Sequence, residues 1–235
     1  MEKSNNWQTV AVPHKTESYS PIGHKHLIGL LRMSLENAGF HVAENRVTQS
    51  AKGDEISGHM IINGDTGEPD FRHMLAYTNS YNKRVPIRLV SGAEVYVCLN
   101  GMVVGDIITM RKHTGNIVPA LKPMIRTAIE GVRSNMLKTK ADITVMKNID
   151  LTRTMAAELV GRMFVEEMIL TSREASVVAS QLRKPRFEEF QPNNLWSLYN
   201  HCTFAMKEIR VARRIPALKQ LHDFTMDVAM ELNHV

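Results

Sequence analysis

The fold of this chain is decided by HVAENRVTQ (41–49), AKGDE (51–55) and ISGHMIIN (56–63). Apolar and polar residues alternate in the first and third stretches, which is the two-residue period of a β-strand. The middle stretch contains Gly53 and Asp54, residues typical of turns. The three stretches together predict a β-hairpin.

The segments on either side extend this hairpin into a sheet packed by helices. Before it, apolar residues recur at helical spacing over residues 25–38, and Gly39 follows as a helix stop signal. After it, strand-like patterns recur at residues 71–79, 85–90 and 94–99. We therefore expect four to six antiparallel strands.

Helical patterns replace the strand patterns beyond Thr114. Apolar residues from Ile117 to Met136 have the spacing of an amphipathic helix. Three further helical stretches follow, at about residues 152–182, 193–210 and 216–232. Pro216 marks the expected corner between the last two. The predicted fold class is α+β, an antiparallel sheet packed by helices with a helical C-terminal half.

These patterns divide the chain into three regions. Residues 1–24 are polar and without a period, so we expect an N-terminal arm. Residues 25–150 form the α+β core with the sheet and the long basic helix. Residues 151–235 form a helical region packed on or beside that core.

Composition excludes several classes of protein. The 235 residues are 43% hydrophobic and 23% charged, as in a soluble globular protein. No run of about 18 apolar residues occurs, and the N-terminus lacks the apolar segment of a signal peptide, so we expect a cytoplasmic protein without a membrane partner. Cys98 and Cys202 are too few for a disulfide framework or a structural zinc site.

The positive charge is concentrated in two blocks, although the net charge is only +5. Residues 83–147 carry 11 basic and 4 acidic side chains, a net +7. Residues 183–219 carry 8 and 3, a net +5. A basic surface of this kind is compatible with nucleic acid as a partner.

The most specific local signal is a row of cations in the helix after Thr114. Its members are spaced four and seven residues apart: Lys122, Arg126, Arg133, Lys140 and Lys147. At 100° per residue they fall within about 60° of one another on a continuous helix. We predict that the first four bind nucleic-acid phosphates. The alternative is a solvated helix face that only aids solubility.

A second basic cluster surrounds the turn YTNSYNKR (77–84). Its cations lie in the turn, on the next strand and just before the long helix: Lys83, Arg84, Arg88, Arg111 and Lys112. Tyr77 and Tyr81 flank the turn. Cations for the backbone and aromatic faces for the bases characterise single-strand platforms, so we predict that the two tyrosines stack bases. The alternative for the tyrosines is packing in the core.

A third cluster lies near the expected corner at Pro216 and comprises Arg210, Arg213, Arg214 and Lys219. It is either a second phosphate contact or a contact to acidic groups, such as those of residues 220–235.

Metal and catalytic motifs are missing from the sequence. Neighbouring strands could bring His59 and His73 together, but no cluster of known ligand spacing accompanies them. There is no GxSxG, no P-loop and no cysteine with an evident histidine partner. We therefore expect no metal, no cofactor and no enzymatic activity, and a metal-dependent nuclease is the least favoured hypothesis.

Several motifs resemble those of one family. They are TNSY (78–81), PIRLVSG (86–92), VYVCLNGM (95–102) and NLWSLYN (194–200). In this order they resemble the core of a large uncharacterised family encoded by phages, prophages and plasmids, domain of unknown function nine hundred thirty-two. The resemblance covers about residues 25–210 and departs from the family pattern at residues 81–83.

The resemblance implies a mobile-element context. The layout it implies is similar to that of phage single-strand annealing proteins, which bind DNA in a basic groove within ring oligomers. We therefore predict a phage- or plasmid-encoded protein that binds single-stranded DNA in recombination or replication, as a homo-oligomer. The alternative is a non-enzymatic interaction protein that sequesters a host protein or nucleotide signal of a defence system.

Overall fold

The computed structural model describes residues 6–63, 71–95, 101–103, 109–115 and 117–233. Within them, six strands form one antiparallel sheet, and five of them follow the order β1-β2-β3-β4-β5. The same edge of β4 pairs with β5 at residues 92–94 and with β6 at residues 87–89. The α+β class and the strand number predicted from the sequence are confirmed. The strands are β1 (His41–Gln49), β2 (Glu55–Asn63), β3 (Phe71–Ser80), β4 (Ile87–Val95), β5 (Gly101–Val103) and β6 (Thr109–Arg111).

Helices precede and follow the sheet, and the C-terminal half is helical as predicted. The α-helices are α1 (His24–Asn37), α2 (Ile117–Lys147), α3 (Arg153–Gly161), α4 (Ser172–Arg183), α5 (Leu195–Ala205) and α6 (Val211–Asn233). Short helical turns connect them: η1 (Asn6–Gln8), the π-helical η2 (Arg162–Glu166), η3 (Glu188–Phe190) and η4 (Met206–Glu208). No helix within the described ranges is long and apolar enough to cross a membrane.

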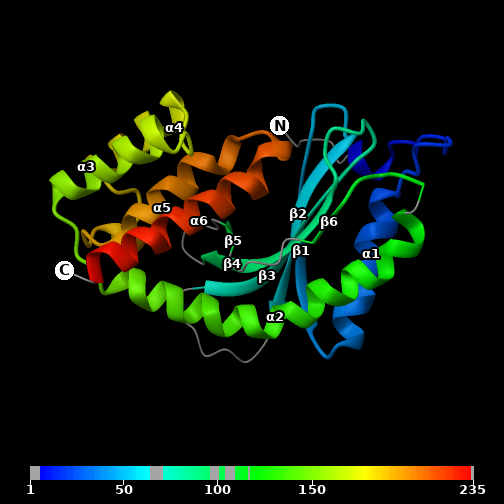
Figure 1. The fold of residues 1–235 in the computed structure, drawn as a ribbon, viewed down its shortest axis with the longest axis horizontal. Helices are drawn as coiled ribbons and strands as arrows, with labels where there is room; N and C mark the ends of the chain where they lie inside the picture. Colours follow the sequence, from blue (N-terminus) through cyan, green and yellow to red (C-terminus); the bar gives the residue numbers. More distant parts are fainter. Residues whose placement is uncertain (1–5, 64–70, 96–100, 104–108, 116, 234–235) are drawn as a thin grey trace.

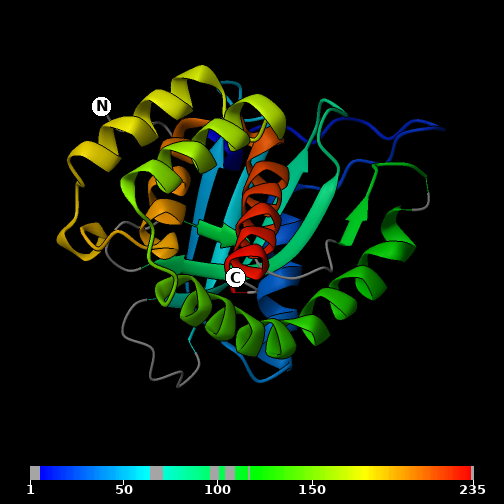
Figure 2. The same ribbon diagram turned by 60° about the vertical axis from the view of Figure 1, so that its left-hand side comes forward.

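The central sheet separates two apolar cores (Figures 1 and 2). Alternate residues of β2, such as Ile56 and Met60, pack with α1 and the first half of α2. Ile61, which points to the opposite face of β2, and its cross-strand partner Met74 of β3 pack with α5 and α6. Because both faces of the sheet are covered, β3 and β4 are buried along almost their whole length.

Helix α2 contributes to both cores because it passes from one side of the sheet to the other (Figure 1). Its first half, including Leu121 and Ile125, belongs to the core with α1. Its second half, including Ile143 and Met146, belongs to the core with α5 and α6. The predicted region boundary at residue 150 therefore follows the end of a helix that packs against both regions.

Three boundaries differ from the sequence prediction. The stretch 152–182 is not one helix, since η2 ends at Glu166 and α4 begins at Ser172. The stretches 85–90 and 94–99 are not separate strands, since β4 runs through Gly92 without a turn. A Cβ on Gly92 would lie 2.0 Å from the carbonyl oxygen of Met102, so this glycine permits close approach of β5. Residues 96–100 lie outside the described residues.

The corner between the last two helices precedes Pro216. Helix α5 ends at Ala205, η4 follows, and α6 already begins at Val211. Pro216 lies inside α6 near its start. Pro216 is the sixth residue of α6 and so lies beyond the four first donors, which have no partner within a helix; it removes one hydrogen bond, the one to the Ala212 carbonyl.

Candidate functional site

The cations predicted on the long helix lie on one edge of α2, and we call Lys122, Arg126, Arg133 and Lys140 the basic flank. Helix α2 is continuous over 31 residues, so the predicted alignment holds along its backbone. The side chains of Lys122, Arg126 and Lys140 are exposed, and that of Arg133 lies outside the description. The buried residues Leu121 and Ala128 lie about 115° to 135° from the centre of the flank around the helix.

Arg111 and Lys112 lie beside the start of α2. They line a hollow of about 340 Å³ between β6 and the first turn of α2, together with Ile117. Arg111 pairs with Ile87 of β4 and so points to the same face of the sheet as α1 and the first half of α2. These two cations therefore lie beside the N-terminal end of α2, next to Ile117 and Ala120, which are on the other side of the helix from Lys122 and Arg126.

Arg88 lies on the other face of the sheet, because it pairs with Met110 rather than with Arg111. It is half-buried, and burial lowers the pKa of its guanidinium. Its buried Nη1 has no hydrogen-bond partner among the described residues. The prediction that Arg88 extends one groove with α2 is wrong, because residues 87 and 88 point to opposite faces.

Lys83 and Arg84 lie in the β3–β4 turn. Both are exposed, and Lys83 has a positive φ of 66°. The Lys83 ammonium lies 4.7 Å from the centre of the Tyr19 ring, in a cation–π contact with the N-terminal arm. Arg84 lines a different cavity, between this turn and the start of α6. The two cations of the turn therefore have different neighbours, the N-terminal arm for Lys83 and the start of α6 for Arg84.

Tyr77 belongs to the core and has no exposed surface. Its hydroxyl donates a hydrogen bond to Asn45 Oδ1 at 2.7 Å. Burial raises the pKa of Tyr77, and the hydrogen bond to Asn45 opposes this only in part. The predicted base-stacking role is wrong for Tyr77, because its ring fills the space between the sheet and α1.

Tyr81 is also buried, and its ring stacks on His24 at 3.9 Å between centroids. Its hydroxyl accepts a hydrogen bond from the His24 backbone N–H. The His24 ring lies between the Gly53 carbonyl, 3.2 Å from Nε2, and Asn79 Nδ2, 2.9 Å from Nδ1. The predicted base-stacking role of Tyr81 is therefore also wrong, because a histidine already occupies the ring face.

The His24 environment favours the neutral imidazole. Nε2–H donates to the Gly53 carbonyl, which leaves Nδ1 to accept from the amide of Asn79. Burial lowers the pKa of His24 to about 4, and the Gly53 hydrogen bond opposes this shift. The polar residues of the predicted turn motif thus fix the N-terminal arm to the sheet.

The third basic cluster is divided among internal contacts. Arg213 binds Glu174 at 2.6 Å, and Glu174 also completes the capping box of α4 with Thr171. Lys219 pairs with Asp223 one turn later in α6. For these two cations the acidic partner lies within the chain. Arg214 has no acidic partner within ion-pair distance in the described ranges, and it donates to Thr48 Oγ1 at 2.9 Å.

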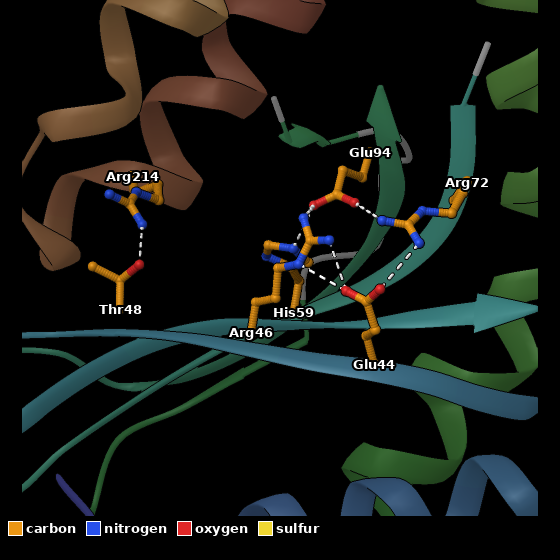
Figure 3. Close-up of polar contacts among 7 residues, drawn as sticks. All are labelled: Glu44, Arg46, Thr48, His59, Arg72, Glu94 and Arg214. Atoms are coloured by element: carbon orange, nitrogen blue, oxygen red, sulfur yellow. Dashed lines mark hydrogen bonds and ion pairs between the residues drawn. The ribbon is translucent and has the colours of Figure 1, made fainter. Parts of the chain in front are cut away.

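A buried carboxylate cluster, absent from the sequence prediction, lies on the sheet face covered by α6 (Figure 3). Glu94 of β4 is fully buried. Its carboxylate lies 2.6 Å from Arg46 Nη1, 2.6 Å from Arg72 Nη2 and 3.0 Å from His59 Nε2. Glu44 of β1 pairs with both arginines from the open side. We call these five residues the Glu94 cluster.

Strand register assembles the Glu94 cluster. Arg46 is the cross-strand partner of His59, and Arg72 is the cross-strand partner of Glu94. Burial alone would raise the pKa of Glu94, but hydrogen bonds from His59 and Arg72 outweigh it and hold that pKa below its usual range. The carboxylate therefore remains charged and fixes the side chains around it.

The cluster had a weak sequence signal. Glu94 is the acidic residue of IRLVSGAEV, an otherwise mainly apolar strand, and a charge in a buried strand needs partners. Glu44, Arg46 and Thr48 alternate along β1, which places them on one face. To see that these residues form one cluster, the register of four strands must be known, and a single sequence does not supply it.

The structure also separates the histidines considered for a metal site. His59 shares a face with Ala76, whereas His73 pairs with Ile62 and shares its face, so the two rings lie on opposite sides of the sheet. Among the described residues, no group of three or more histidine, cysteine, aspartate or glutamate side chains could hold a metal ion. Cys202 is a free, buried thiol, and burial raises its pKa to about 12.

Comparison with known proteins gives one family and no characterised relative. Residues 8–223 match the family described as Domain of unknown function (DUF932). No curated protein and no solved structure matches the chain. The match includes the sheet, α2 and the helices up to the middle of α6. Because it spans most of the 235 residues, the chain belongs to the DUF932 family.

Proposed function

We propose that the protein binds single-stranded DNA along the basic flank of α2, through the phosphate backbone. The observation that carries the proposal is an uninterrupted helix of 31 residues with its cations on one edge. A helix of that length extends about 46 Å at 1.5 Å per residue. A strand laid along α2 would meet Lys122 near the start of the helix and Lys140 beyond its middle.

The charge of α2 supports an anionic partner. The helix contains six lysine and arginine residues and two acidic residues, Glu130 and Asp142. Asp142 is buried against His222, with Oδ2 and Nε2 3.1 Å apart, so Glu130 is the exposed acid on this described helix. Each phosphate neutralised by a lysine or arginine releases condensed counterions, which favours binding at low salt.

The burial of Tyr77 and Tyr81 limits the kind of recognition. Without these rings as a stacking platform, the contacts that support the proposal are to phosphates. Phosphate contacts position a strand but carry no base information. We therefore expect binding that is independent of base sequence.

The test is fluorescence anisotropy with labelled single-stranded DNA and a duplex of the same sequence. The double variant Lys122→Glu/Arg126→Glu should lose single-strand binding, since it places two acids where phosphates would lie. The matched control is Arg173→Glu/Lys184→Glu, which reverses one arginine and one lysine, both exposed at the ends of α4. Both variants change the net charge equally.

The proposal requires a loss confined to the α2 variant. An equal loss in both variants would mean that net charge alone drives the association. Unchanged affinity of the α2 variant, or no DNA binding by the wild-type protein, would overturn the proposal. Tighter binding of the duplex would reject the preference for single strands.

A further inference from the structure

Two adjoining cavities separate the sheet from the start of α6. The first has a volume of about 420 Å³ and lies over Arg46, His59 and Glu94. The second, of about 850 Å³, extends toward the β3–β4 turn and is lined by Arg84. Both cavities are lined by the same four residues, Thr48, Lys207, Glu208 and Arg214, which therefore form their junction. Volumes of this order are typical of small-molecule sites.

Arg214 projects into this junction from α6 (Figure 3). Its Nη1 donates to Thr48 Oγ1 and its Nη2 donates to the Lys207 carbonyl. Both acceptors are neutral, and in the described part of the chain no carboxylate lies within ion-pair distance of this guanidinium. Burial lowers the pKa of Arg214, and the more distant Glu208 opposes that shift. Arg214 is thus a half-buried cation held in place by neutral groups.

The neighbouring Arg213 is a partly buried cation with a structural role. Its guanidinium binds the buried carboxylate of Glu174 at 2.6 Å. Partly buried charges in proteins are ordinarily paired in this way, because desolvation is costly. Arg214 lies one residue further along the helix and lacks such a partner, so an anion from outside the chain would complete its coordination.

The opposite wall supplies further polar groups on a rigid support. Arg46 and His59 line the 420 Å³ cavity, and their positions are fixed by the buried carboxylate of Glu94. Met206, Ile215 and Leu218 line the helical side of the same cavity. The junction thus offers cations at one end and an apolar wall beside them, which is the usual construction of a site for an amphipathic ligand.

The charge of the lining indicates the class of ligand. Six cations line the two cavities: Arg46, Lys52, Arg84, Lys207, Arg210 and Arg214. The acids of the lining are Asp54, Glu55, Glu94 and Glu208, which leaves a surplus of two positive charges. A phosphate monoester carries close to two negative charges at neutral pH. A carboxylate would neutralise only one of the two.

We propose that this junction binds the phosphate group of a small organic phosphate, such as a mononucleotide, with the phosphate at Arg214 and Thr48 and the organic part in the 420 Å³ cavity over Arg46 and His59. The Thr48 hydroxyl accepts from Arg214 and can donate its own proton to a phosphate oxygen. The basic flank near Lys122 packs on the other side of the sheet, so this site is separate from the proposed DNA surface.

The test is isothermal titration calorimetry with adenosine monophosphate, ribose 5-phosphate, inorganic phosphate and adenosine. We expect adenosine monophosphate and ribose 5-phosphate to bind and adenosine not to bind. Arg214→Gln should weaken binding about ten- to a hundredfold, as expected for the loss of hydrogen bonds to a charged group. Arg183→Gln, at an exposed position of α4 outside both cavities, is the control and should leave binding unchanged.

Folding of the variant is checked by thermal denaturation without ligand. Arg214→Gln should keep most of the wild-type stability, because it removes a half-buried cation that has no acidic partner among the described residues and whose two hydrogen bonds are exposed. A marked loss of stability would overturn the proposal by showing that Arg214 is structural.

Three further outcomes would also overturn the proposal: no binding of either organic phosphate, equal binding by Arg214→Gln, or equal binding of adenosine. A fourth is binding of a single-stranded oligonucleotide that depends on Arg214 while both small phosphates fail to bind. That result would assign the groove to a nucleic-acid strand.

Discussion

The basic flank of α2 and the Glu94 cluster use the same kinds of side chain in opposite ways. On the flank, Lys122 and Arg126 are exposed on a single helix. In the cluster, Arg46 and Arg72 surround a fully buried carboxylate contributed by another strand. Exposed cations cost the fold little and remain available to a partner, whereas cations paired with a buried carboxylate are committed to the fold. The basic residues of this chain must therefore be separated by burial before any is assigned to binding.

The largest effect that this comparison predicts is on the Glu94 cluster. Glu94→Gln removes the charge that holds Arg46, Arg72 and His59, and breaking a buried pair from one side costs about 3–5 kcal/mol. We expect that loss in the free energy of unfolding measured with urea. The control is Glu44→Gln, at a side chain that is 44% exposed, which should cost far less. Equal losses in the free energy of unfolding from the two variants would contradict the distinction between buried and exposed carboxylates.

A second prediction concerns acid stability. The pKa of His24 is about 4 in the fold, below the ordinary 6.5, so between these values the unfolded chain binds a proton that the folded chain does not. Stability should therefore fall as pH decreases from about 6.5 to 4, by at most about 3 kcal/mol for a shift of this size. Glu94 acts in the same direction at lower pH. Its lowered pKa contributes stability above the ordinary glutamate range, and this is lost as pH falls through the folded value.

The pH dependence can be assigned with two variants of the same helix. His24→Asn should flatten the decrease in the free energy of unfolding between pH 6.5 and 4, measured by urea titration at each pH. His26→Asn, at an exposed position two residues further, should leave the decrease as it is in the wild type. A decrease that is unchanged in His24→Asn would show that another group causes the acid sensitivity.

Much of the fold could be predicted from the sequence, because local periodicity determined it. The two-residue period of β1 and β2 and the apolar spacing of α2 each lie within one element, and both were predicted correctly. The alignment of the basic flank follows from the same helical period. The sequence misplaces the start of α6, because Pro216 has the pattern of a helix boundary although it lies inside the helix.

The candidate site was less predictable, because it depends on which face of the sheet each strand side chain points to. Strand β3 is covered on both faces, so alternation gives no indication that Tyr77 faces the core. The Glu94 cluster combines four strands, and its contacts exist only in the observed register. Arg88 and Arg111 are close in the sheet but lie on opposite faces, which only the pairing of β4 with β6 reveals.

A third prediction separates a core tyrosine from a binding tyrosine. Tyr77→Phe removes the hydrogen bond to Asn45 and should lower the free energy of unfolding by about 1 kcal/mol. DNA affinity should not change, because the ring has no exposed surface. Reduced affinity with unchanged stability would contradict the core assignment and restore a role for Tyr77 at the binding surface.

The smallest expected effect is on the stability of the basic flank. Lys122→Ala and Arg126→Ala remove exposed side chains of α2, so each should change the free energy of unfolding by less than about 0.5 kcal/mol. Urea denaturation measures this directly. A loss approaching that of Glu94→Gln would mean that the flank serves the fold, and the contrast between the two regions would disappear.

The central claim, that the basic flank binds nucleic-acid phosphates, is tested most directly by the salt dependence of single-strand affinity. We predict that the logarithm of the binding constant falls linearly with the logarithm of salt concentration, and that Lys122→Ala/Arg126→Ala reduces the magnitude of the slope by about 1.4, or about 0.7 for each lost phosphate contact. A wild-type affinity independent of salt, or a slope unchanged by this double variant, would contradict the claim.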